Sequence, residues 1–122
     1  MSESSKSLEL LKEKLWRLSE RVREIENQAD RSLEENYNLE QHRSLLEKKA
    51  RLLSSLPEEA EPYLDQIQEK TSEAVRNRLD IFARNAEQAL GVGSVFFMRQ
   101  LLYPEDYREG QDNDLESFIR SL

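Results

Sequence analysis

The sequence predicts an all-α protein: a long antiparallel coiled-coil helical hairpin with a short C-terminal helical segment, as part of a multi-helix bundle. A heptad pattern of apolar residues runs through the first half of the chain. The 122 residues include only three glycines and three prolines, so helix breaks are few. Hydrophobic residues make up 37% and charged residues 35%, a balance that suits long helices with a narrow buried face. We expect a single helical domain over residues 1–122.

The first helix is expected at residues 5–54. With Leu8 at heptad position a, the frame of a and d positions continues without a shift over 46 residues, to Leu53. Such a helix would be about 75 Å long at ~1.5 Å per residue, and neither glycine nor proline interrupts it. Two polar residues, Asn36 and Arg43, occupy a positions in the middle. They either fix the register of the pairing or reach solvent beside a narrow partner, and the pattern does not choose between these interpretations.

Apolar residues also stand outside the a and d positions, among them Leu10, Trp16 and Leu45. A two-stranded coil would leave these side chains in water. The charges at the e and g positions include both attractive and repulsive pairs, so they select no parallel self-pairing. The first helix is therefore expected to pack in a bundle with further helices.

The second helix is expected at residues 62–90. Pro57 ends the first helix, and Pro62 is tolerated only in the first turn of the next one. A short turn between two long helices makes an antiparallel hairpin. The second helix is too short to reach the start of the first. Residues Leu8 to Ile25 must therefore be covered by the residues after Gly93 or by another protein.

Two shorter helices are expected near the C-terminus. Residues 94–103 are the most apolar stretch of the chain, and Pro104 ends that helix. A last helix at residues 113–121 begins with Asn113 and Glu116 in the positions of a capping box. Its apolar residues have the spacing of anchors in a partner's groove. The same spacing suits a helix that folds onto its own bundle, which is the interpretation we favour.

No catalytic or metal site is expected. The chain has no cysteine, and His42 is its only histidine, so the usual nucleophile–base pairs have no support. The sequence Gly91-Val-Gly93 follows a helix rather than a strand, which indicates a helix C-cap and hinge instead of a phosphate loop. We expect no enzymatic activity, no cofactor and no small-molecule substrate.

The charge distribution limits the classes of partner that the chain can bind. Residues 1–56 hold 11 basic and 11 acidic side chains, whereas residues 57–122 hold 7 and 14, so the net charge of −7 belongs to the second half. Nucleic-acid binding needs a basic stripe, and none is present. The chain contains no stretch of 18 apolar residues, so membrane insertion is not expected. The lack of cysteine fits a reducing compartment, so an intracellular, cytoplasmic location is expected, with the nucleus left open.

These features predict a non-catalytic coiled-coil subunit or adaptor of a multiprotein assembly, which binds partner helices through the heptad face and the aromatic C-terminal segment. The partners would be other helical proteins, further copies of this chain, or both. The alternative is a small helical chaperone that shields a partner or an export substrate. The predicted partner-binding residues are the apolar side chains of the uncovered heptads and the C-terminal helices: Leu8, Leu11, Leu15, Trp16, Leu18, Val22, Ile25, Phe96, Phe97, Leu101, Leu102, Leu115, Phe118, Ile119 and Leu122.

Overall fold

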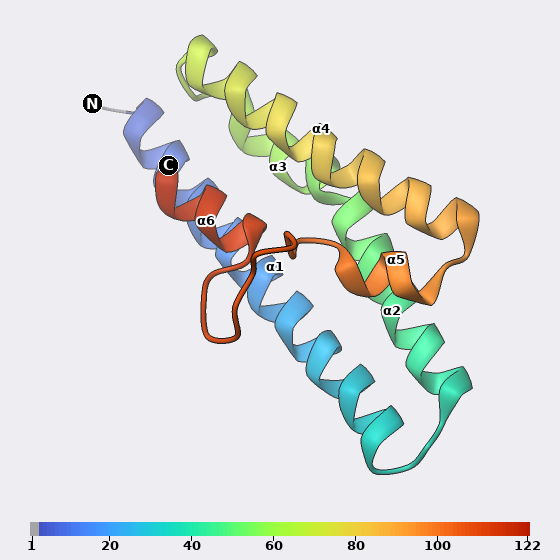
Figure 1. Cartoon of the computed structure of the whole chain (residues 1–122). Helices are drawn as coiled ribbons and strands as arrows, with labels where there is room; N and C mark the ends of the chain where they lie inside the picture. Colours follow the sequence, from blue (N-terminus) through green and yellow to red (C-terminus); the bar gives the residue numbers. More distant parts are fainter. Residues whose placement is uncertain (1–2) are drawn as a thin grey trace.

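Helices joined by turns and loops make up the protein, and the predicted all-α class is confirmed (Figure 1). The computed structural model describes residues 3–122, and no strand occurs among them. In chain order the helices are α1 (Glu3–Glu34), α2 (Leu39–Ser54), α3 (Leu56–Leu64), α4 (Glu69–Val92), α5 (Val95–Gln100) and α6 (Asp114–Ser121).

The expected single helix over residues 5–54 is wrong. A turn at residues 35–38 divides it, and α2 runs back along α1 as the second arm of a hairpin (Figure 1). The local sequence explains the turn. Tyr37 takes a left-handed backbone conformation with φ of 51°, and the Asn38 side chain caps α2 by accepting a hydrogen bond from the Gln41 amide at 2.9 Å. Asparagine favours such caps because its short amide competes with the helix for backbone groups. Asn36 therefore lies in a turn and neither fixes a register nor faces a partner helix.

The hairpin has one continuous antiparallel register. Contacts move back along α1 as they move forward along α2 and α3, so a single arm of the chain covers most of α1. Leu11, Leu15 and Val22 are fully buried in the core that this arm shares with α4 and α6. The N-terminal heptads are thus covered within the chain, by α2 and α3 and, as one of the two expected alternatives had it, by residues after Gly93, which form α6. From the turn outward, the polar contacts between the arms are Ala29 with His42 (2.7 Å), Glu26 with Lys49 (2.9 Å), Lys14 with Glu59 (3.0 Å) and Ser7 with Gln66 (3.2 Å).

The predicted helix 62–90 has a different start. Pro62 lies inside α3, and α4 begins at Glu69 after a turn. Pro57 stands in the first turn of α3, where its missing N–H has no partner to lose. At the other end of α4 the prediction is confirmed, because Gly93 caps the helix with a left-handed φ of 72°. Glycine adopts this conformation without the steric cost of a Cβ atom.

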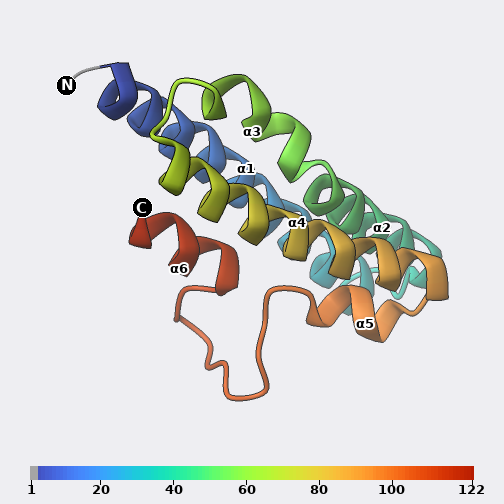
Figure 2. The same ribbon diagram turned by 90° about the horizontal axis from the view of Figure 1, so that it is seen from above.

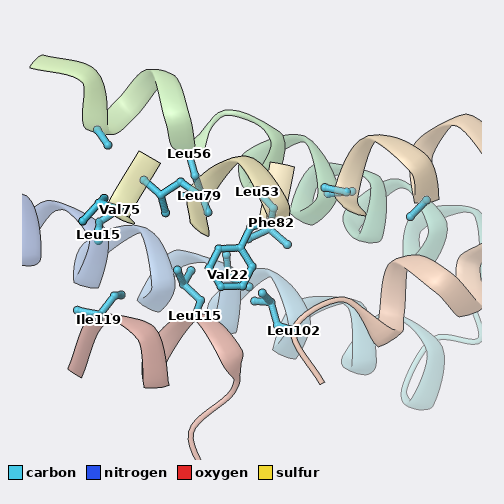
Figure 3. Close-up of a cluster of buried hydrophobic side chains, with 14 of the residues drawn as sticks. Leu15, Val22, Leu53, Leu56, Val75, Leu79, Phe82, Leu102, Leu115 and Ile119 are labelled. Carbon is cyan, nitrogen blue, oxygen red and sulfur yellow. The ribbon is translucent and has the colours of Figure 1, made fainter. Parts of the chain in front are cut away.

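The helices share one apolar core (Figure 3). Leu15 and Val22 of α1 meet Leu53 of α2 and Phe82 of α4 there. Helix α6 packs beside α1 and places Leu115 in the same core, so the favoured interpretation of this helix agrees with the structure. Its predicted capping box is also present, since the Asn113 and Glu116 side chains each accept a hydrogen bond from the other's main-chain amide. The predicted helix 94–103 is shorter, because α5 ends at Gln100.

Candidate partner-binding surface

The structure divides the fifteen predicted partner-binding residues by exposure. Only Phe96 and Phe97 are exposed, at 64% and 51%. The chain's own helices thus cover most of the residues that the heptad pattern offered to a partner. Seven are buried: Leu11, Leu15, Val22, Ile25, Leu102, Leu115 and Ile119. Six are half-buried against the core: Leu8, Trp16, Leu18, Leu101, Phe118 and Leu122.

Exposed apolar side chains gather at one end of the bundle. The α1–α2 turn and the α4–α5 junction lie at this end in both views (Figure 1, Figure 2). Arg43, one turn into α2, joins them by donating a hydrogen bond to the Gly93 carbonyl at 2.8 Å. Among the described residues, seven large apolar side chains are exposed, and five belong to this end: Tyr37, Leu39, Val92, Phe96 and Phe97. Sequence reasoning missed Tyr37, Leu39 and Val92, because it placed the first two inside a continuous helix. The Asn-Tyr-Asn sequence was the available signal for a turn.

Helix α5 presents the two phenylalanines. The Ser94 hydroxyl caps this short helix by accepting a hydrogen bond from the Phe97 amide at 3.1 Å. Met98 is fully buried and anchors the helix to the core. With Met98 facing inward, Phe96 and Phe97 point outward, and their rings meet edge to face with centroids 5.9 Å apart.

A groove of about 690 Å³ opens beside Phe97, between α4 and the segment that follows α5. Val92 and Phe97 stand at one end, and Leu101 and Leu102 contribute to its apolar lining. A separate, smaller cavity of about 90 Å³ adjoins the groove, because Asn85, Leu101, Leu102 and Asp114 line both. Asn85 and Val92, which both line the groove, are seven residues apart on α4, which is about 10 Å along a helix. The remaining groove residues are mostly amides and small side chains, and Asp114 is its only charged lining residue.

A buried lysine fixes the segment that forms the groove. The Lys49 ammonium lies 2.9 Å from a Glu26 carboxylate oxygen and donates hydrogen bonds to the carbonyls of Arg99 and Leu101 at 3.2 and 3.1 Å. Burial lowers the pKa of Lys49, and the neighbouring Glu26 carboxylate offsets part of that lowering. The Tyr103 hydroxyl donates to the other Glu26 oxygen at 2.5 Å. Burial is the main cause that raises the pKa of Tyr103, and this hydrogen bond is the second.

A second polar contact holds α6 and the loop before it. Arg23 of α1 binds both carboxylate oxygens of Glu116, at 2.7 and 3.0 Å. It also donates to the hydroxyls of Tyr103 and Tyr107 and to the Gln111 carbonyl. Burial alone would raise the pKa of Glu116, but the bonds from Arg23 and from the Asn113 amide lower it below its ordinary value. These contacts join residues about ninety positions apart, so no local pattern could have predicted them.

Comparison of the chain with protein-family models, with curated proteins and with solved structures found no match. Within residues 3–122, no helix has both the length and the apolar character of a membrane span. The same part of the chain holds no group of three or more metal-binding side chains. The candidate surface therefore rests on its own geometry: exposed aromatic rings beside an apolar groove.

Proposed function

We propose that this protein is a non-catalytic subunit or adaptor that binds an amphipathic helix of another protein. The binding site is the docking surface, which we define as Val92, Phe96, Phe97 and the groove along α4 from Asn85. The observation that carries the proposal is the exposed aromatic pair, in which Phe97 lines this groove and Phe96 packs against Phe97. Contiguous exposed apolar surface on an otherwise covered core is typical of protein interaction sites.

The shape of the groove favours a helix as the occupant. Its wall along α4, from Asn85 to Val92, is about 10 Å long, which matches about two turns of a second helix. Apolar side chains at helical spacing would enter between α4 and Leu101, and Asn85 and Gln88 would contact the polar flank of the incoming helix. An added β-strand would need an exposed strand edge, and residues 3–122 contain no strand.

The energy of binding would come mainly from the two aromatic rings. Fully burying a phenylalanine side chain contributes roughly 1.5–3 kcal/mol, and Phe96 and Phe97 keep half or more of their surface in water. Aromatic residues that become covered at the centre of an interface commonly dominate its affinity. The core does not need these two rings, because Met98 fills the position under α5.

Site-specific photocrosslinking tests the proposal. A benzophenone amino acid replaces Phe97 in the full chain, which is expressed in its native cells, and a second chain carries the same group at Leu10. Leu10 is a matched control, because it is also exposed, at 44%, but lies on α1. We expect position 97 to crosslink to the apolar face of a helix in another protein, identified by mass spectrometry, and position 10 not to do so. The proposal is wrong if both positions give the same products, or if position 97 crosslinks only to a second copy of this chain.

A further inference from the structure

The three glycines of the chain differ in what their backbone requires. Gly93 and Gly110 have left-handed backbones, with φ of 72° and 93°, which a residue with a Cβ atom adopts only at a steric cost. Gly91 instead lies inside α4, two residues before the cap of that helix, and its φ is not positive. Every residue type can adopt a helical backbone of this kind, so the backbone gives no reason for a glycine at position 91.

The packing of the free chain gives no reason for Gly91 either. Apart from its own stretch of α4, a Cβ atom built at position 91 would have no atom of residues 3–122 within 4 Å. Glycine also weakens a helix relative to alanine, because it loses more backbone freedom on folding. The chain therefore has, at position 91, a residue that destabilises α4 slightly and that the fold does not need.

Gly91 belongs to the docking surface. It lines the groove together with Gln88, three residues before it, and Val92, which follows it. Gly91 is exposed, and the space that its missing side chain leaves is open. The wall of the groove thus has a gap between Gln88 and Val92. We call this gap at Gly91 the notch.

The neighbours of Gly91 decide which part of a partner can enter the notch. Residues three and four places apart are neighbours on a helix surface, and those before Gly91 are Gln88 and Glu87. Neither side chain is small, and Val92 beside the notch is 68% exposed. These side chains hold the backbone of a second helix at the ordinary separation of about 8–10 Å between axes. A single side chain of that helix can enter the notch, as a knob enters a hole between packed helices.

We infer that Gly91 determines specificity at the docking surface, and that its notch receives one large apolar side chain of the partner helix. This inference rests on the proposed function, because the same helix would occupy the groove. The side chain is apolar because Val92, Phe97 and Leu101 line the groove around the notch. It is large, as leucine, isoleucine, methionine or phenylalanine are, because a small side chain would leave the notch empty and lose the contacts of its walls.

The first test combines the photocrosslinker at position 97 with substitutions at position 91. Gly91→Ala should raise the melting temperature of the purified chain by about 1–4 °C, because alanine is the better helix former. The same substitution should lower the crosslink yield by about threefold or more, and Gly91→Leu by about tenfold or more, because the added atoms fill the notch. A variant that is more stable than the parent chain cannot lose its partner through misfolding.

Asn77→Ala is the matched control for Gly91→Ala. Asn77 is exposed on α4 but does not line the groove. Alanine should raise the melting temperature there by a similar amount and leave the crosslink yield unchanged. The inference is overturned if Gly91→Ala lowers the melting temperature, because the fold then needs glycine at this position. An unchanged crosslink yield with Gly91→Ala overturns it as well.

A second test identifies the side chain that enters the notch. The large apolar residues of the crosslinked helix are changed to alanine one at a time in the partner. One of these changes should lower the yield strongly with the parent chain but by a much smaller factor with Gly91→Leu, in which the notch is already filled. If every change lowers the yield by the same factor with both chains, no side chain of the partner occupies the notch, and the inference is overturned.

The two proposals can fail separately. If position 97 crosslinks to the apolar face of a helix in another protein but the yield does not respond to the residue at position 91, only the inference about the notch fails. If position 97 gives no such crosslink, the proposed function fails as well.

Discussion

Lys49 and Glu26 form an ion pair of 2.9 Å across the two arms of the α1–α2 hairpin, with the lysine side chain only 1% exposed. The pair belongs to the interior, so solvent does not screen it as it screens surface pairs. Through the carbonyls of Arg99 and Leu101, the same ammonium joins the end of α5 to the hairpin. This one cation therefore links the hairpin to the segment that lines the docking surface.

Removing the buried cation should destabilise the protein strongly. With Lys49→Met, the Glu26 carboxylate stays partly buried without its counter-ion, and two carbonyls lose their donor. We expect the free energy of unfolding to fall by about 3 kcal/mol, measured by guanidinium denaturation. Lys48→Met, at an exposed neighbouring position, is the control and should change it by less than about 0.5 kcal/mol.

A double variant separates the lost ion pair from lost packing. Adding Glu26→Gln to Lys49→Met removes the uncompensated charge and should restore part of the lost stability. If Lys49→Met is as stable as Lys48→Met, the lysine is hydrated in solution and does not hold α5 in place.

Glu116 should make the protein sensitive to acid. Its pKa is lowered from the ordinary value of 4.5, because the Arg23 and Asn113 bonds to the charged carboxylate outweigh the opposing effect of burial. A carboxylate whose pKa is lower in the folded state stabilises the fold fully above its unfolded pKa, and this contribution is lost as the pH falls through the folded pKa. We expect the free energy of unfolding to decrease between about pH 5 and about pH 3, and Glu116→Gln to weaken that decrease.

Arg23→Gln provides the complementary measurement. It removes the guanidinium bonds to Glu116 and leaves the burial, so the lowering of the Glu116 pKa should diminish. The acid sensitivity should weaken as it does with Glu116→Gln. The free energy of unfolding is measured at a series of pH values. If it falls with decreasing pH by the same amount in the parent chain and in both variants, this role of Glu116 is contradicted.

Local signals in the sequence predicted local structure well. The all-α class follows from the heptad pattern and the scarcity of breakers. The capping box at Asn113 and Glu116 and the glycine cap at Gly93 both occur where the sequence placed them. Each of these depends on residues within one or two helical turns, so a linear pattern contains the information that it needs.

The hairpin turn and the polar contacts escaped prediction for physical reasons. The heptad frame continues across residues 35–38, since Ala29 before the turn and Leu46 after it are both buried in that frame. A periodic pattern records which face is apolar but not whether the chain reverses. Lys49 occupies a heptad position that is usually solvent-exposed, and its burial depends on Glu26 and the end of α5. Such contacts exist only once the fold is formed, so the sequence alone could not separate the α1 residues that the fold covers from Phe96 and Phe97, which stay exposed.

The docking surface predicts unequal losses of stability for two apolar truncations. Ile119 is 3% exposed in the core, so Ile119→Ala should lower the free energy of unfolding by about 2–4 kcal/mol. Phe97 is 51% exposed, so Phe97→Ala should lower it by less than about 1 kcal/mol, although it removes more atoms. Guanidinium denaturation of the two purified variants gives both values.

The comparison also tests whether the surface is open in solution. If Phe97→Ala destabilises the chain as much as Ile119→Ala does, the Phe97 ring is packed in the free protein, and the docking surface is not available to a partner. If Phe97→Ala is nearly neutral for stability but abolishes binding to the protein that position 97 crosslinks, the ring serves the complex rather than the fold. Burial in the free chain gives Ile119 a role in stability, and exposure leaves Phe97 available to the partner that we propose.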